Sequence, residues 1–191
     1  NCAFIGAGNS NIANANNAFI GGGFSNTASG VCAVVGGGHD NTASSTCTTV
    51  GGGRSNTSAG TTATVAGGML NVADDARAFV GGGVCNYSTA ADSTVVGGAC
   101  LSAAAVEAFA GGGRLNAACG VQSTVVGGLS NIATSANAFI GGGSINAVHG
   151  LSAAAVGGQL NIAKGITSFV GAGRLNKTTA DYGVVVGSLC N

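Results

Sequence analysis

The sequence reads FIGGGFSNTASG from Phe19 to Gly30, and this order of side-chain types returns every 15 residues along the 191-residue chain. The clearest column of the repeat is asparagine, and Leu101 takes the one place in it that asparagine leaves empty. Its members are Asn11, Asn26, Asn41, Asn56, Asn71, Asn86, Asn116, Asn131, Asn146, Asn161, Asn176 and Asn191. Stacked amides of this kind hydrogen-bond from layer to layer, so we interpret the column as a structural Asn ladder that points inward.

The other columns keep the same period. A branched apolar residue such as Ile20 or Val35 stands six places before each asparagine, and glycine stands four places before most of them. Recurrent Gly pairs disfavour helix by about 1 kcal/mol per Gly. Fifteen residues also make too short a unit for a helical hairpin or a propeller blade. We therefore predict an all-β, single-chain β-solenoid of about 13 coils, forming one uncapped domain over residues 1–191 that is part of a longer fibre or stacks end to end.

A second period of 30 residues marks one strand of the coil. From Phe79 onward, coils with Phe followed by Gly two places later alternate with coils that carry a medium-sized side chain at both places. Residues two apart on a strand share a face, so packing volume is conserved along that face. The residue between them is apolar too, which is typical of a strand buried on both sides. We expect another copy of the chain to cover this self-association face: Phe79, Thr94, Val96, Phe109, Thr124, Val126, Phe139, Val156 and Phe169.

These repeats resemble the head domain of the YadA-like trimeric autotransporter adhesins, whose coil reads Ser-Val-Ala-Ile-Gly-x-x-Ser-x-Ala-x-Gly. The order from Phe19 to Gly30 follows that pattern, and residues 34–43, 139–147 and 169–176 do likewise. Similar Gly-rich arrays also look like parts of bacterial and phage fibre proteins. The resemblance implies a left-handed parallel β-roll, trimerised about the fibre axis on a cell or virion surface. The period of 15 in place of 14 is a departure from the adhesin pattern.

The composition excludes several classes of partner. The chain has six Lys and Arg, six Asp and Glu, and no Pro or Trp, and its formal net charge is zero. Nucleic acids and anionic membranes are bound by clusters of basic residues, which are missing here. Gly, Asn and Ser interrupt every apolar run, so we expect no direct membrane insertion.

Seven cysteines suggest covalent links. Cys32 and Cys47 are one period apart, as are Cys85 and Cys100, and stacked coils would bring each pair within the Cα separation of a disulfide. We predict two inter-coil disulfides and an oxidising, extracellular location. The alternative is free thiols that act as small apolar side chains. Cys2 and Cys190, near opposite ends, are candidates for intermolecular bridges.

No motif points to catalysis, a cofactor or a metal. His39 and Asp40 are neighbours without a nucleophile placed beside them, and the Gly triplets lack the Lys and Ser or Thr of a phosphate-binding loop. Three N-x-S/T sequons begin at Asn56, Asn86 and Asn176, inside the Asn column, which makes them poor glycan acceptors once folded. We expect no enzyme.

The leading function is a structural or adhesive module of an extracellular fibre. Its partners would be other copies of the chain, as a homotrimer or an end-to-end filament, together with glycans or surface proteins. One alternative is an ice-binding solenoid, for which the Thr27, Thr42 and Thr57 ladder is the best candidate surface. The other is the shaft of a phage or viral tail fibre, which shares the fold and differs in what it is attached to.

Overall fold

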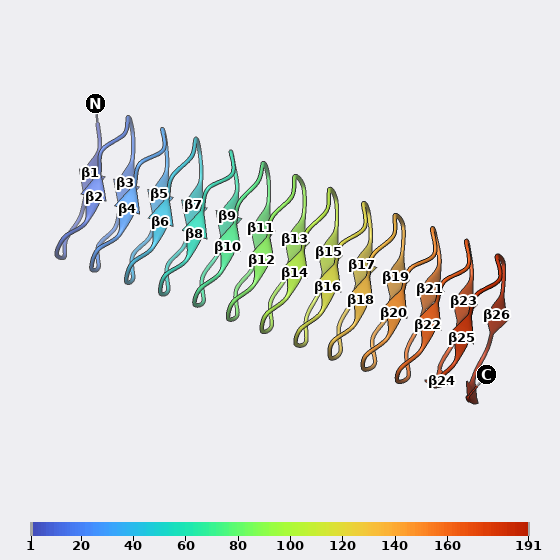
Figure 1. Ribbon diagram of the computed structural model, residues 1–191. Coiled ribbons are helices and arrows are strands. Elements are labelled where there is room, and N and C mark those ends of the chain that lie inside the picture. Colours follow the sequence, from blue (N-terminus) through green and yellow to red (C-terminus); the bar gives the residue numbers. More distant parts are fainter. Residues whose placement is uncertain (1, 191) are drawn as a thin grey trace. The chain divides into compact units, whose positions relative to one another are not determined.

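The computed structural model describes residues 2–190 (Figure 1). Every regular element among these residues is a two-residue β-strand, and none of them lies in a helix. The chain divides into two compact units, Asn1–Gly97 (unit 1) and Gly98–Asn191 (unit 2). Each unit is described by itself below.

In unit 1, each coil gives one strand to a first sheet and one to a second sheet. The first sheet contains, in spatial order, β1 (Phe4–Ile5), β3 (Phe19–Ile20), β5 (Val34–Val35), β7 (Thr49–Val50), β9 (Thr64–Val65), β11 (Phe79–Val80) and β13 (Thr94–Val95). The second sheet contains β2 (Ile12–Ala13), β4 (Thr27–Ala28), β6 (Thr42–Ala43), β8 (Thr57–Ser58), β10 (Val72–Ala73) and β12 (Tyr87–Ser88).

Unit 2 repeats this arrangement. Its first sheet contains β15 (Phe109–Ala110), β17 (Thr124–Val125), β19 (Phe139–Ile140), β21 (Ala154–Ala155), β23 (Phe169–Val170) and β26 (Val184–Val185). Its second sheet contains β14 (Ser102–Ala103), β16 (Ala117–Ala118), β18 (Ile132–Ala133), β20 (Ala147–Val148), β22 (Ile162–Ala163) and β25 (Lys177–Thr178). A small additional pair joins β24 (Gly173–Arg174) to β27 (Ser188–Leu189).

The pairing register equals the sequence repeat. Strands pair in parallel with residues 15 positions apart, as in Val34↔Thr49 and Val35↔Val50 of unit 1. Unit 2 does the same, for example Ile132↔Ala147. The prediction of an all-β solenoid with 15 residues per coil is confirmed, with about 12 turns where the sequence predicted about 13.

The interior is narrow and is filled by small and branched side chains. In the first sheet the second residue of each strand points inward, and in the second sheet alanine occupies most inward positions. The fully buried branched residues of this kind are Ile20, Val35, Val50, Val65, Val80 and Val95 in unit 1, and Val125, Ile140 and Val170 in unit 2. Alternation of inward and outward residues is what the two-residue period of a strand requires.

The Asn side chains also lie inside the coils, and Asn41 illustrates their bonding. Its Nδ2 donates hydrogen bonds to the carbonyl oxygens of Gly37 (3.0 Å) and Gly53 (2.9 Å). Its backbone N–H donates to Oδ1 of Asn26, and its own Oδ1 accepts the N–H of Asn56, both at 3.0 Å. Each amide therefore joins its own coil to both neighbours. Asn191 lies outside the described residues.

Two corners of the coil adopt a left-handed backbone without glycine. Corner one is the residue just before each Asn position, and corner two is the residue six places after it. The non-glycine residues at these corners have φ between 53° and 65°. This region is uncommon outside Gly, Asn and Asp, and it is most strained for β-branched side chains.

Candidate functional site: the outer face of the first sheet

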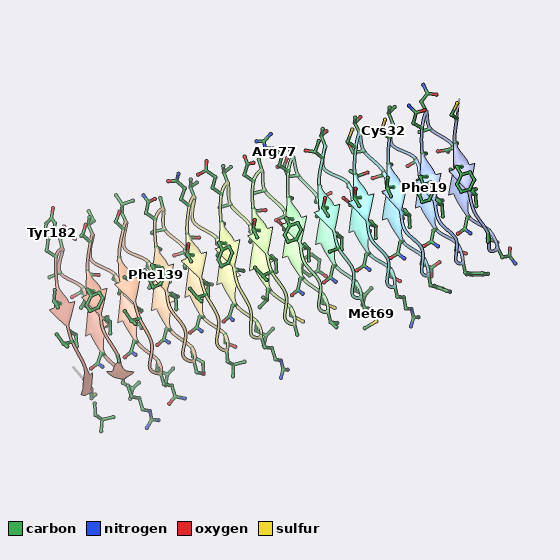
Figure 2. All side chains as sticks on the ribbon, turned by 180° about the vertical axis from the view of Figure 1, so that it is seen from behind. Phe19, Cys32, Met69, Arg77, Phe139 and Tyr182 are labelled. Carbon is green, nitrogen blue, oxygen red and sulfur yellow. The ribbon has the colours of Figure 1, made fainter. Side chains whose placement is uncertain are left out.

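The outer face of the first sheet is uncharged in both units and carries Phe, Val, Thr, Ala and Gly. It consists of the first residue of each strand and the residue two places further on, and no Asp, Glu, Lys, Arg or His occupies any of these positions from Phe4 to Val186. Phe19 of unit 1 and Phe139 of unit 2 lie on this face in Figure 2. We call it the first-sheet face.

The predicted alternation of side-chain volume is seen in the contacts between each phenyl ring and a nearby glycine. A Cβ atom built on Gly81 would lie 3.4 Å from Cε1 of Phe79, and one on Gly111 would lie 3.1 Å from Cε1 of Phe109. Each phenyl ring thus covers the glycine two residues along its own strand. In the coils between, valine fills the position that glycine leaves to the ring, so from Phe79 onward the face is corrugated with a period of two coils.

All the residues predicted for self-association lie on this face, and each keeps part of its surface in water. Phe79, Val96, Val126, Phe139 and Val156 expose between 38% and 50% of their surface. The remaining members are half-buried: Thr94, Phe109, Thr124 and Phe169. At the start of unit 1, the rings of Phe4 and Phe19 stack with centroids 5.4 Å apart. The strands that begin with Phe or Val are therefore apolar on both sides, and the interior covers only one of these sides.

Cys32, Cys47, Cys85 and Cys100 are free thiols in the structure, so the two inter-coil disulfides stay a prediction. Cys32 and Cys47 occupy corner two of neighbouring coils, with φ of 56° and 57°. Cys2 and Cys190 are exposed free thiols as well.

The sequons begin at residues that the solvent does not reach. Asn56, Asn86 and Asn176 are fully buried members of the Asn ladder. In unit 2, Leu101 fills the ladder position without an amide and is fully buried too. The ladder is a structural element of the interior and offers no surface for a ligand.

Two polar surface groups lie outside the first-sheet face. Phe24 stacks on His39 with ring centroids 5.0 Å apart, and His39 Nδ1 lies 2.8 Å from Asp40 Oδ2. At corner two, Arg77 donates two hydrogen bonds to the carboxylate of Asp92, of 2.5 and 2.6 Å. This pair was not predicted from the sequence, although opposite charges 15 residues apart are the signal for it.

The threonine strip considered for ice binding is short. Thr27, Thr42 and Thr57 are in register on neighbouring strands of the second sheet in unit 1. The next two positions are Val72 and Tyr87. A regular hydroxyl array therefore extends over three coils of this sheet.

Within residues 2–190, no three His, Cys, Asp or Glu side chains lie close enough together to hold a metal ion. The surface of this part of the chain has no pocket. The same residues include no helix of the length and hydropathy needed to cross a membrane. No protein-family model matches the sequence, and a search of curated proteins finds no significant relative.

Proposed function

We propose that this protein is a structural module of an extracellular fibre, which self-associates through the first-sheet face and presents its remaining, weakly charged surface to adhesive partners such as glycans or surface proteins. The observation that carries the proposal is the continuous uncharged face with half-exposed Phe and Val side chains. The resemblance to adhesin heads and to phage fibre repeats supports the fibre and its location on a cell or virion surface.

Burial of this face would stabilise an oligomer. Covering a fully exposed Val or Phe side chain contributes about 1.5–3 kcal/mol, so each half-exposed side chain contributes about half of that. No charge has to be removed from water, and charge is the costly component of an interface. Five half-exposed Phe and Val side chains on the predicted face together contribute a free energy on the order of several kcal/mol.

The shape of the face favours another copy as the occupant. Rings at Phe109 and Phe139 alternate with valines at Val126 and Val156, which gives a corrugation with a pitch of about 9.6 Å, two coils of about 4.8 Å each. Close packing requires ridges of one surface to fill the grooves of the other. A second copy carries the same pitch and so meets this requirement over the coils from Phe79 onward.

Light scattering on a concentration series tests the proposal. The variant Val126→Thr/Phe139→Thr/Val156→Thr keeps strand-forming side chains and introduces the residue that Thr124 already places on this face. We expect the wild-type chain to form an oligomer and this variant to have the mass of a monomer. The control is Val106→Thr/Val121→Thr, which changes two exposed valines away from the first-sheet face.

Circular dichroism melting establishes that each variant is folded. An oligomer that the triple variant leaves intact, or that the control variant disrupts equally, would contradict association through the first-sheet face.

A further inference from the structure

The two units carry side-chain charge of opposite sign. Unit 1 has four acidic and two basic side chains, and unit 2 has two acidic and four basic ones, so their net charges are −2 and +2. The net charge of zero therefore results from opposite charges in the two halves of the sequence. Oppositely charged surfaces on one kind of subunit attract each other between copies.

In unit 2, Lys164 and Lys177 form a basic group on the outer side of the second sheet. Lys177 is the first residue of β25 and pairs with Ile162 of β22, and Lys164 follows β22 directly. The backbone N–H of Lys164 donates to the carbonyl oxygen of Thr178 at 2.9 Å, so the two lysines lie on neighbouring coils. Both side chains are exposed. Like charges on adjacent strands repel each other, so the isolated unit gains no stability from this placement.

The lysines of the basic group have no acidic partner within the described part of unit 2. The two carboxylates of this unit bond elsewhere. Glu107 accepts a hydrogen bond from Nε2 of Gln122 at 2.8 Å. Asp181 accepts one from the backbone N–H of Ile166, also at 2.8 Å. The basic group is therefore available to a negatively charged partner.

In unit 1, the corresponding place of the coil is acidic. Asp74 follows β10 directly, as the first lysine of the basic group follows β22, and its backbone N–H donates to the carbonyl oxygen of Ser88 at 3.0 Å. Asp75 is the next residue, and both carboxylates are exposed. Oδ1 of Asp75 accepts the backbone N–H of Ala76 at 2.6 Å, whereas the Asp74 side chain makes no hydrogen bond or ion pair within residues 2–190. Asp74 and Asp75 are the acidic group.

We propose that the basic group of one copy binds the acidic group of another copy. The two groups have equal numbers of opposite charges, so one contact neutralises both. They also follow equivalent strands of the same coil, so the backbone presents them in the same way. The contact places unit 1 of one copy against unit 2 of the other, and it disfavours contacts between two copies of unit 1 or two copies of unit 2.

The inference rests on the proposed function and extends it. The charged groups lie on the second sheet and the uncharged face on the first, so the charged contact joins first-sheet oligomers to one another. Exposed ion pairs are individually weak, but each oligomer presents several groups at once. The two contacts differ in their response to salt, because the screening length falls to about 3 Å at 1 M salt and only the charged contact is screened.

The test reverses each group in the full chain. The acidic-group variant is Asp74→Lys/Asp75→Lys, and the basic-group variant is Lys164→Glu/Lys177→Glu. All four positions are exposed, and circular dichroism melting establishes that each variant is folded. Sedimentation velocity gives the average mass of each variant alone and of their equal mixture, at low salt and in about 1 M salt.

The matched control is Arg54→Glu/Arg114→Glu. It reverses two exposed cations outside the basic group, so it changes the net charge of the chain by the same amount as the basic-group variant. A general effect of net charge would appear in both, whereas a specific contact is lost only in the basic-group variant.

We expect the wild-type chain and the control at low salt to have roughly twice the average mass that they have in about 1 M salt, where only the first-sheet contact persists. Each group variant alone should keep the lower mass at both salt concentrations, because its two groups then carry charge of the same sign. The mixture should regain the wild-type mass at low salt, since the lysines of one variant meet the glutamates of the other.

A mixture that regains no mass, or a control that loses as much as the basic-group variant, overturns the charged contact. The salt series on the wild-type chain tests it without any substitution: an oligomer of constant mass overturns the charged contact and leaves the proposed function standing. A wild-type chain that is monomeric in about 1 M salt and oligomeric at low salt overturns the first-sheet face and retains the charged contact. A chain of 17.8 kDa throughout overturns both.

Discussion

At the scale of single residues, the buried asparagine pairs backbone groups both within its own coil and between neighbouring coils. Its Nδ2 satisfies carbonyl oxygens of two successive Gly turns, and its Oδ1 accepts the backbone N–H of the next coil. Buried polar groups of the backbone have to be paired, and a coil this thin has no room for water to pair them. The amide therefore fixes the turn and the stacking of the coils together.

Replacing Asn41 by Ala should destabilise unit 1 strongly. The change leaves the carbonyl oxygen of Gly37 and the N–H of Asn56 without their side-chain partner, whereas the carbonyl oxygen of Gly53 keeps the N–H of His39. Each unsatisfied group costs about 1–3 kcal/mol, so we expect a loss of about 2–5 kcal/mol in the free energy of unfolding. Urea denaturation measures it, with the exposed Asn16→Ala as the control; equal effects of the two substitutions would contradict the role of the amide.

Thr62 provides a test of strain at the corners. It is a β-branched residue with φ of 58° at corner two, where Asn17 stands in an earlier coil. We expect Thr62→Asn to raise the free energy of unfolding by about 0.5–1 kcal/mol, because asparagine tolerates this backbone better. The neighbouring Thr61→Asn should have no such effect, and a stabilisation of the same size there would show that the backbone is not the cause.

The Arg77–Asp92 pair predicts a pH dependence of stability. The hydrogen bonds from Arg77 hold the pKa of Asp92 below its ordinary value. A carboxyl whose folded pKa is lowered stabilises the fold above its unfolded pKa, and this contribution is lost as the pH falls through the folded pKa. We expect Asp92→Asn to lower the melting temperature at neutral pH and to match the wild-type chain in strong acid. Asp74→Asn, a change at another exposed carboxylate, is the control; a difference for Asp92→Asn that persists in acid would contradict the ion pair.

At the scale of elements, the coil depends on glycine where neighbouring backbones approach each other. A methyl group on Gly81 would overlap the carbonyl oxygen of Val96 in the next coil, whereas one on Gly67 would meet no atom within 4 Å. We expect Gly81→Ala to cost about 2 kcal/mol or more. Gly67→Ala should be neutral or slightly stabilising, because alanine restricts the unfolded chain. Thermal melting of the two variants compares them directly, and equal melting temperatures would contradict the close approach.

The columns of the repeat predicted the elements well, because a strict period translates into a register. Asn41 inside the coil, Val80 in the interior and Phe79 on the outer face all followed from alternation along a strand. The repeat also places Cys32 and Cys47 at equivalent positions of neighbouring coils, where they are free thiols, because a period gives the spacing of stacked residues and not the bond between them. The strain at Ile145 was hidden for a similar reason: glycine usually signals a left-handed backbone, and no glycine stands there.

At the scale of the whole molecule, most residues form the repeated coil and few carry chemically reactive side chains. Its two units follow the same coil, and both keep the outer face of the first sheet free of charge. Solenoid coils are stabilised by their neighbours, so the fold itself needs no apolar outer face. The proposed contact between copies gives a role to a face that the fold does not require and that is corrugated with a period of two coils from Phe79 onward.

Sedimentation equilibrium of the unmodified chain tests this central claim most directly. Over a micromolar concentration series we expect an average mass that rises above 17.8 kDa with concentration. The association should persist when salt is raised, because an uncharged apolar contact is not screened. A mass that stays at 17.8 kDa across the whole series would contradict self-association as the purpose of the first-sheet face.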